Sequence, residues 1–173
     1  MPESYYRALG EESFESTIHT QGAWNDHEQH MAPVSGLLAY ALENCSPRAD
    51  MRLARISYDI LGVIPRGTFD VRTKILRPGR TIELLEAELI AEGRTAVRAT
   101  AWRLAAGSTG EVAALEDARM PGPDGLDTAF GLTQWPGDFI NSLDFRAVEG
   151  LRPGRGQVWV RTPYEMGEGA PSS

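Results

Sequence analysis

The sequence predicts an α+β fold in which a long central helix is wrapped by a curved antiparallel sheet. Two observations support this prediction. One strongly apolar helical segment lies at residues 31–45, and the segments after it alternate as strands do, with no second long helix. A sheet of four or five strands has to bury one face, and only this helix is available to cover it.

The helical segment reads MAPVSGLLAYALENC and begins directly after His30. Its apolar residues fall at i, i+3, i+4, i+7, i+8 and i+11, which places them on one stripe of a helix. Pro33 suits the first turn, where a backbone N–H has no acceptor within the helix. Cys45 is the single cysteine, so no disulfide can form within the chain, and an ordinary core residue is predicted.

Strands are predicted on both sides of this helix in the chain. A short strand is expected over residues 14–19, and alternating apolar residues indicate strands over 54–60 and 69–75. The segment TIELLEAELIAEG fits a helical stripe and a strand almost equally well. We favour a strand, because Gly93 predicts a hairpin turn into a strand over residues 97–101. This choice requires a β-bulge near Leu84.

The composition along the chain predicts its domain organisation. Residues 1–106 form one domain, and the Gly- and Pro-rich residues 107–131 are expected to be a linker. Within residues 132–173, the runs FINSLDFRAV and GQVWVRT indicate two further strands, and the segment after Pro163 is expected to be disordered. An isolated hairpin is marginal in water, so these strands either join the first sheet or begin a second domain.

The composition also argues against several function classes. The 173 residues are 42% apolar and 24% charged, as in soluble globular proteins. The net charge of −7 argues against a nucleic-acid partner, because phosphate backbones require a basic surface. No apolar run reaches the length of a membrane span, and the N-terminal segment lacks the regions of a signal peptide. Cytoplasmic residence is therefore predicted.

All three histidines lie in one stretch, IHTQGAWNDHEQHMAP at residues 18–33. Their spacing resembles neither HExxH nor a Cys/His cluster, so no metal and no cofactor are predicted. In a structural interpretation, Asn25 or Asp26 caps a helical turn, Trp24 packs on the core, and the histidines are solvated. In a functional interpretation the stretch lines a site, because N–H groups at a helix start attract negative charge.

Two segments resemble a known family, namely HTQGAWNDHEQHMAPVSGLLAYALE and ISYDILGVIPRGTFDVRTKILRPGRTIELLEAELIAEGRTAVRATAWRL. Together, over roughly residues 10–104, they resemble the N-terminal half of the acyl-CoA thioesterase II-like proteins of the thioesterase-like superfamily. The most specific features are a Trp followed by a Gln-His pair and a Pro-containing helix start, and the later RPGR. The resemblance implies a double hotdog fold, with residues 132–173 supplying only the first strands of the second hotdog.

The chain departs from the family pattern in two respects. The small-residue turn that usually opens the helix is replaced by His30-Met31-Ala32-Pro33. In the thioesterase II proteins, the Asp, Thr and Gln implicated in hydrolysis come from the second half, beyond the last residue of this sequence. The resemblance therefore assigns a general location, near the start of the central helix, but no catalytic residue.

These observations together predict hydrolysis of acyl-CoA thioesters, with the helix N-terminus holding the oxyanion. Asp26 and Glu28 are candidate bases, His30 can polarise the carbonyl or orient water, and Asn25 can donate a hydrogen bond. The substrate-binding candidates are Trp24, Gln29, Met31, Arg77 and Arg80. The two arginines lie in RPGR and either hold the phosphates of coenzyme A or are solvated turn residues.

Two other functions stay open at this point. A hotdog module can bind acyl-CoA or mediate oligomerisation without catalysis. An enoyl-CoA hydratase is less well supported, because the usual Asp/His dyad is not visible. In either case a lone hotdog leaves a long sheet edge unpaired, which predicts a homo-oligomer or pairing with a second hotdog.

Overall fold

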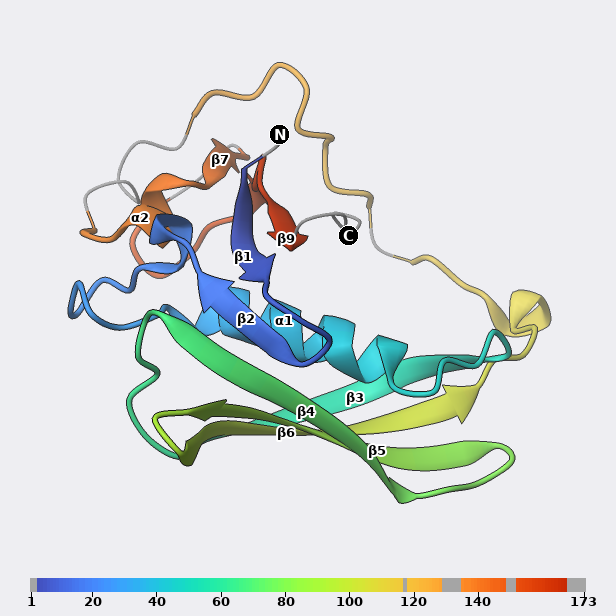
Figure 1. The fold of residues 1–173 in the computed structure, drawn as a ribbon. Helices are drawn as coiled ribbons and strands as arrows, with labels where there is room; N and C mark the ends of the chain where they lie inside the picture. The colour runs from blue at the N-terminus through green and yellow to red at the C-terminus, as the bar shows by residue number, and fades with distance from the viewer. Residues whose placement is uncertain (1–2, 117, 129–134, 149–151, 168–173) are drawn as a thin grey trace.

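In the computed structural model, a seven-stranded sheet curls around one long helix, α1 (Met31–Asn44) (Figure 1). The structure describes residues 3–116, 118–128, 135–148 and 152–167. The strand order is β3-β6-β5-β4-β2-β1-β9, and all neighbours are antiparallel except β1 and β9. The strands of this sheet are β1 (Ser4–Ala8), β2 (Ser13–Ser16), β3 (Met51–Ile60), β4 (Thr68–Arg77), β5 (Ile82–Ala91), β6 (Arg94–Ala105) and β9 (Glu165–Gly167). The predicted helix wrapped by a sheet is confirmed.

The apolar stripe of α1 packs against the inner face of the sheet, where its nearest strands are β5, β4 and β3. Val34, Leu37, Leu38 and Leu42 are almost fully buried. The facing sheet residues are Leu85, Ala87, Leu89, Val97, Ala99 and Ala101, and all are buried too. Burial of each large aliphatic side chain contributes about 1.5–3 kcal/mol, and the small alanines let the helix approach the sheet closely.

The ambiguous segment is the strand β5, and its inner face is regular. Alternate residues from Glu83 to Ala91 are buried, so no slip occurs within β5 near Leu84. The extra residue is Leu76 on the neighbouring strand β4, opposite Leu84. The sequence did not indicate that Glu83 faces inward. Its buried charge is neutralised by Arg103 on β6. Because Arg103 is distant in the chain, only the fold shows this pairing.

The N-terminal region differs from the prediction. The strand β1 was not expected, because its sequence shows no alternation of apolar and polar residues. In the structure its first three residues are all buried. Both of its faces are covered, with Tyr5 against Phe139 and Tyr6 against Phe69. The predicted strand over 14–19 ends early, and His19 lies instead in a 3₁₀ turn, η1 (Ile18–Thr20).

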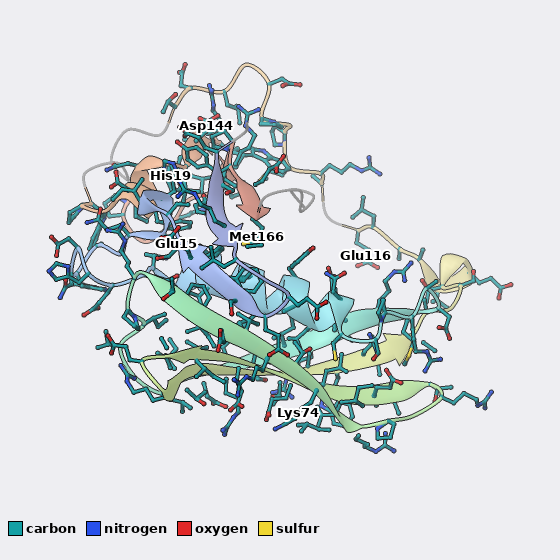
Figure 2. All side chains as sticks on the ribbon, in the orientation of Figure 1. Glu15, His19, Lys74, Glu116, Asp144 and Met166 are labelled. Carbon is teal, nitrogen blue, oxygen red and sulfur yellow. The ribbon has the colours of Figure 1, made fainter. Side chains whose placement is uncertain are left out.

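Of the described C-terminal strands, only β9 joins the first sheet, and β7 (Asp144–Ala147) and β8 (Val158–Arg161) form a separate two-stranded sheet. The helix α2 (Asp138–Asn141) packs against η1. The expectation of disorder directly after Pro163 is wrong, because β9 pairs with β1. Figure 2 shows Met166 of β9 above α1, where its side chain leaves no room for a Cβ at Gly36. Residues 168–173 lie outside the described residues.

The second-hotdog prediction stays a prediction. Between residues 107 and 128, the described part of the linker contains the short 3₁₀ turn η2 (Gly110–Val112) and a single β-bridge from Thr128 to Arg146. No helix among the described residues is both long and apolar enough to cross a membrane. Cytoplasmic residence also stays a prediction.

Candidate functional site

The residues before α1 form a closed loop that leads into the helix. Gln21 and Gln29 form a β-bridge, and the N–H of Gly22 donates to the carbonyl of Glu28 at 2.9 Å. The N–H of His30 donates to the carbonyl of Thr20 at 2.7 Å. The loop ends are therefore fixed to each other, and residues 24–27 at its tip are exposed to solvent.

Gln29 anchors this loop to the core. Its Oε1 accepts a hydrogen bond from the buried Tyr6 hydroxyl at 3.0 Å, and its Nε2 donates to the carbonyl of Pro65 at 2.8 Å. Its backbone N–H donates to the carbonyl of Ile64. Burial raises the pKa of Tyr6 well above its usual value, so the hydroxyl remains a donor. Gln29, predicted to contact substrate, is buried and engaged at both ends of its amide.

His30 is the N-cap of α1. Its Nδ1 accepts a hydrogen bond from the N–H of Ala32 at 3.1 Å, so the neutral ring carries its proton on Nε2. The ring stacks on Phe139 of α2, with centroids 4.4 Å apart. Burial lowers the pKa of His30, which favours this neutral form at pH 7. The ring can therefore donate a hydrogen bond from Nε2.

The helix start offers few other donors. The N–H groups of His30 and Ala32 are already used, and Pro33 has none. For the N–H of Met31, the described residues provide no acceptor. Met31 N–H and His30 Nε2–H are therefore the two donors that a ligand oxygen could use at this helix start.

The exposed tip of the loop is held by its own side chains. Asn25 Oδ1 accepts a hydrogen bond from the N–H of His27 at 2.8 Å, and Asp26 lies 3.3 Å from His27 Nε2. The structural interpretation that Asn25 caps a turn is therefore supported. Its companion, that Trp24 packs on the core, is wrong, because Trp24 is 88% exposed and contacts only Trp135 among the described aromatic rings. Glu28 is partly buried beside Pro65.

The two candidate arginines lie at the other end of α1. Arg77 is the last residue of β4 and Arg80 lies in the turn before β5, and both are exposed. Arg48 binds the carbonyls of this turn, and its neighbour Arg103 binds the carbonyls of Cys45 and Ser46 after the helix C-terminus. A 14-residue helix is about 21 Å long, so the structure does not bring these arginines together with His30.

Arg66 is the charged residue that the sequence did not single out. Its backbone N–H donates to the carbonyl of His27 at 2.9 Å, and its Nη1 donates to the carbonyl of Asp26 at 3.0 Å. Its Nε is buried and has no acceptor within the part of the chain that the structure describes. The turn IPRG contains this residue, but only the folded loop places it beside the start of α1.

Several pockets lined by described residues lie away from His30. One of about 490 Å³ is near the C-terminal end of α1 beside Arg48 and Arg103. One of about 430 Å³ lies on β7 and β8, and one of about 410 Å³ lies beside Tyr40 of α1. No group of three metal-binding side chains converges in the described ranges.

The arrangement of a long helix inside a curved antiparallel sheet is that of the hotdog proteins. A hotdog protein of unknown function from Alicyclobacillus acidocaldarius matches with a TM-score of 0.63 and 11% identity, over 83% of this chain and 53% of its own. A proposed thioesterase from Novosphingobium aromaticivorans has a TM-score of 0.67 and 17% identity, over 92% of this chain and 65% of its own. An acyl-CoA thioesterase II from Mycobacterium marinum has a TM-score of 0.56 and 14% identity, over 91% of this chain and 56% of its own. At these identities the likeness shows the fold alone.

A comparison of the sequence with known protein families adds to this likeness of fold. Residues 20–104 match the family of the acyl-CoA thioesterase N-terminal domain. The resemblance to acyl-CoA thioesterase II-like proteins is thereby confirmed. No curated protein matches the chain significantly. The chain spans 53% and 65% of the length of the first two structures named above.

Proposed function

We propose that this chain acts on acyl-CoA thioesters at the start of α1. The observation that supports the proposal most is the cap formed by His30. Because Nδ1 accepts a hydrogen bond from the N–H of Ala32, the neutral ring has its N–H on Nε2, and the N–H of the following residue, Met31, has no acceptor among the described residues. The family match to acyl-CoA thioesterase domains supplies the substrate class.

The proposed reaction is hydrolysis. A water molecule attacks the thioester carbonyl carbon, and the carbonyl oxygen takes up the negative charge. That oxygen accepts hydrogen bonds from Met31 N–H and His30 Nε2–H, each worth roughly 100-fold or more in rate. Asp26 or Glu28 takes the proton of the water. The C–S bond then breaks, and the coenzyme A thiolate leaves the carboxylic acid product.

The test compares His30→Asn with the unaltered chain, using release of free thiol from a panel of acyl-CoAs. Asparagine is a good N-cap, so the helix start is retained while Nε2–H is lost. We expect kcat to fall about 100-fold, with a melting temperature that stays unchanged above pH 7. The control is His19→Asn, which removes a ring that packs on Tyr164 and has no part in the proposed chemistry. Equal kcat in His30→Asn and the unaltered chain would refute the role of His30.

A second candidate function is acyl-CoA binding without hydrolysis. The covering of the His30 ring by Phe139 favours it, because α2 lies where a substrate has to reach the helix start. This candidate predicts saturable acyl-CoA binding with no thiol release. If a version extended through a second hotdog also releases no thiol, hydrolysis is the wrong function.

A further inference from the structure

Beside the proposed carbonyl site lie a guanidinium group with unused donors and an exposed pair of tryptophans. We propose that Arg66 and Trp24 form a subsite for the adenine nucleotide end of the substrate, in which Arg66 binds phosphate and Trp24 stacks on the base. This inference rests on the proposed function and names how that site recognises coenzyme A. It also replaces Arg77 and Arg80 as the phosphate-binding residues within this chain.

Arg66 has the chemistry of a phosphate-binding residue. Its guanidinium makes a single hydrogen bond, to the carbonyl of Asp26, and no ion pair joins it to a carboxylate within the described ranges. Its buried Nε–H has no acceptor there either. An unsatisfied buried donor costs about 1–3 kcal/mol, which an anion held by the guanidinium fork would recover. Most other arginines near the sheet already have a carboxylate or several carbonyl acceptors, as Arg103 has.

Trp24 has the surface of a stacking residue. It is 88% exposed and meets Trp135, itself 54% exposed, edge to face at 6.4 Å. Two indole rings left in water without burial in the core indicate a binding surface rather than a structural contact. Stacking of one base on an aromatic side chain is worth about 1–3 kcal/mol.

The tryptophan pair is built by a close contact of two loops. Gly137 has a φ of 109°, and a Cβ there would lie 2.7 Å from the carbonyl oxygen of Gly22. Only glycine permits this approach, which sets Trp135 beside Trp24. The arrangement therefore depends on a specific backbone contact and not on two unrelated surface side chains.

Two parts of the proposed site belong to the loop before α1, and the third, Arg66, is hydrogen-bonded to that loop. Arg66 binds the carbonyls of Asp26 and His27, Trp24 precedes them, and His30 ends the loop. An acyl-CoA has the same order of groups, from base through phosphates to thioester. The carboxylates of Asp26 and Glu28 oppose an anion here, although Asp26 is paired with His27. For an anion to bind here, its attraction to the Arg66 guanidinium has to exceed its repulsion by these carboxylates.

The first experiment measures binding of adenosine 3′,5′-bisphosphate to the full chain by calorimetry. This probe has the base and phosphates but no thioester, so its binding does not depend on hydrolysis. We expect saturable binding that weakens about tenfold in Arg66→Gln and in Trp24→Ala, which corresponds to roughly 1.4 kcal/mol each. The control is Arg94→Gln, since Arg94 also gives one guanidinium hydrogen bond to a loop carbonyl, that of Val63 at 3.1 Å.

The second experiment compares thiol release from an acyl-CoA and from the matching acyl-pantetheine. Arg66→Gln should raise KM about tenfold for the acyl-CoA alone, because acyl-pantetheine lacks the nucleotide. No binding of the bisphosphate, or equal weakening by Arg66→Gln and Arg94→Gln, would overturn the inference. Loss of bisphosphate binding in Arg77→Gln instead would assign phosphate binding to Arg77, at the end of β4. Absence of turnover with both thioesters contradicts the proposed function, while the calorimetry still decides the inference.

Discussion

At the scale of single residues, the state of His30 depends on pH. The cap needs an unprotonated Nδ1, and a protonated ring would place an N–H against the N–H of Ala32. A cation at a helix N-terminus is also unfavourable. Burial lowers the pKa of His30 in the folded protein below the ordinary value of 6.5. The unfolded chain therefore binds more protons than the folded one just below pH 6.5.

This linkage fixes the sign of the first prediction. The contribution of His30 to stability is complete above pH 6.5 and is lost as the pH falls toward the lowered pKa. We expect the melting temperature of the unaltered chain to fall more steeply than that of His30→Asn between about pH 7 and pH 5. Thermal melts of both proteins by circular dichroism at several pH values measure this difference. Parallel curves would show that protonation of the His30 ring does not weaken the helix cap.

Tyr6 gives the second prediction at this scale. Tyr6→Phe removes the donor to Gln29 Oε1 and leaves that oxygen buried, which costs about 1–3 kcal/mol of unfolding free energy. Tyr58→Phe is the matched control, because its hydroxyl also donates to one oxygen, the Ser35 carbonyl, but is only partly buried. Urea denaturation should show the larger loss for Tyr6→Phe. A smaller loss than that of the control would mean that water replaces the tyrosine.

The sequence singles out the stretch before the helix as a candidate site, but the structural role of each residue in it could not be predicted. The histidine-rich stretch and the helix start are visible in the chain itself. Gln29 and His30 are neighbours, yet one is an anchor and the other a cap. That difference depends on Tyr6 and Pro65, which are distant in the sequence. Arg66 was missed for the same reason, since only the fold brings it to the loop.

At the scale of elements, a buried ion pair holds the end of α1 against the sheet. Arg103 donates to Glu83 through Nε at 3.0 Å and Nη2 at 2.6 Å, and it also binds the carbonyls of Cys45 and Ser46. Both charged side chains are almost fully buried. The hydrogen bonds from Arg103 lower the pKa of Glu83. The pair therefore joins β5, β6 and the helix C-terminus.

Removing one charge of this pair gives the third prediction. Glu83→Gln leaves Arg103 as an uncompensated buried cation, which typically costs about 3–5 kcal/mol of unfolding free energy. Glu88→Gln is the control, since Glu88 pairs on the outer face of the sheet with Arg98, which is largely exposed. Chemical denaturation of both variants compares the two losses. Similar losses would mean that water or structural relaxation compensates the buried charge.

Elements with clear periodicity could be predicted, whereas short ones could not. The stripe of α1 and the alternation of β3 and β4 follow from their own residues. The inward Glu83 broke the pattern of β5, so a bulge was placed in the wrong strand. The strand β9 has three residues and depends on β1 at the opposite end of the chain. No local pattern can indicate such a pairing.

At the scale of the whole molecule, the two edges of the sheet differ. The short strand β9 ends one side, and β3, with ten residues, forms the other. A long unpaired edge exposes backbone N–H and C=O groups that favour pairing with another chain. Next to its end lie three exposed apolar residues, Ile60, Leu61 and Val63. The edge and these residues together provide hydrogen bonds and apolar surface for an interface.

The fourth prediction is therefore that this chain associates through β3, with a second copy or with another hotdog unit. Light scattering on a size-exclusion column should give a dimer at micromolar concentrations, and Leu61→Lys should shift it toward monomer by placing a charge in the apolar cluster. Val112→Lys, which changes an apolar residue that is 80% exposed and lies outside the sheet, should leave the dimer intact. A monomer at every concentration, or dissociation by both variants alike, would exclude β3 as the interface.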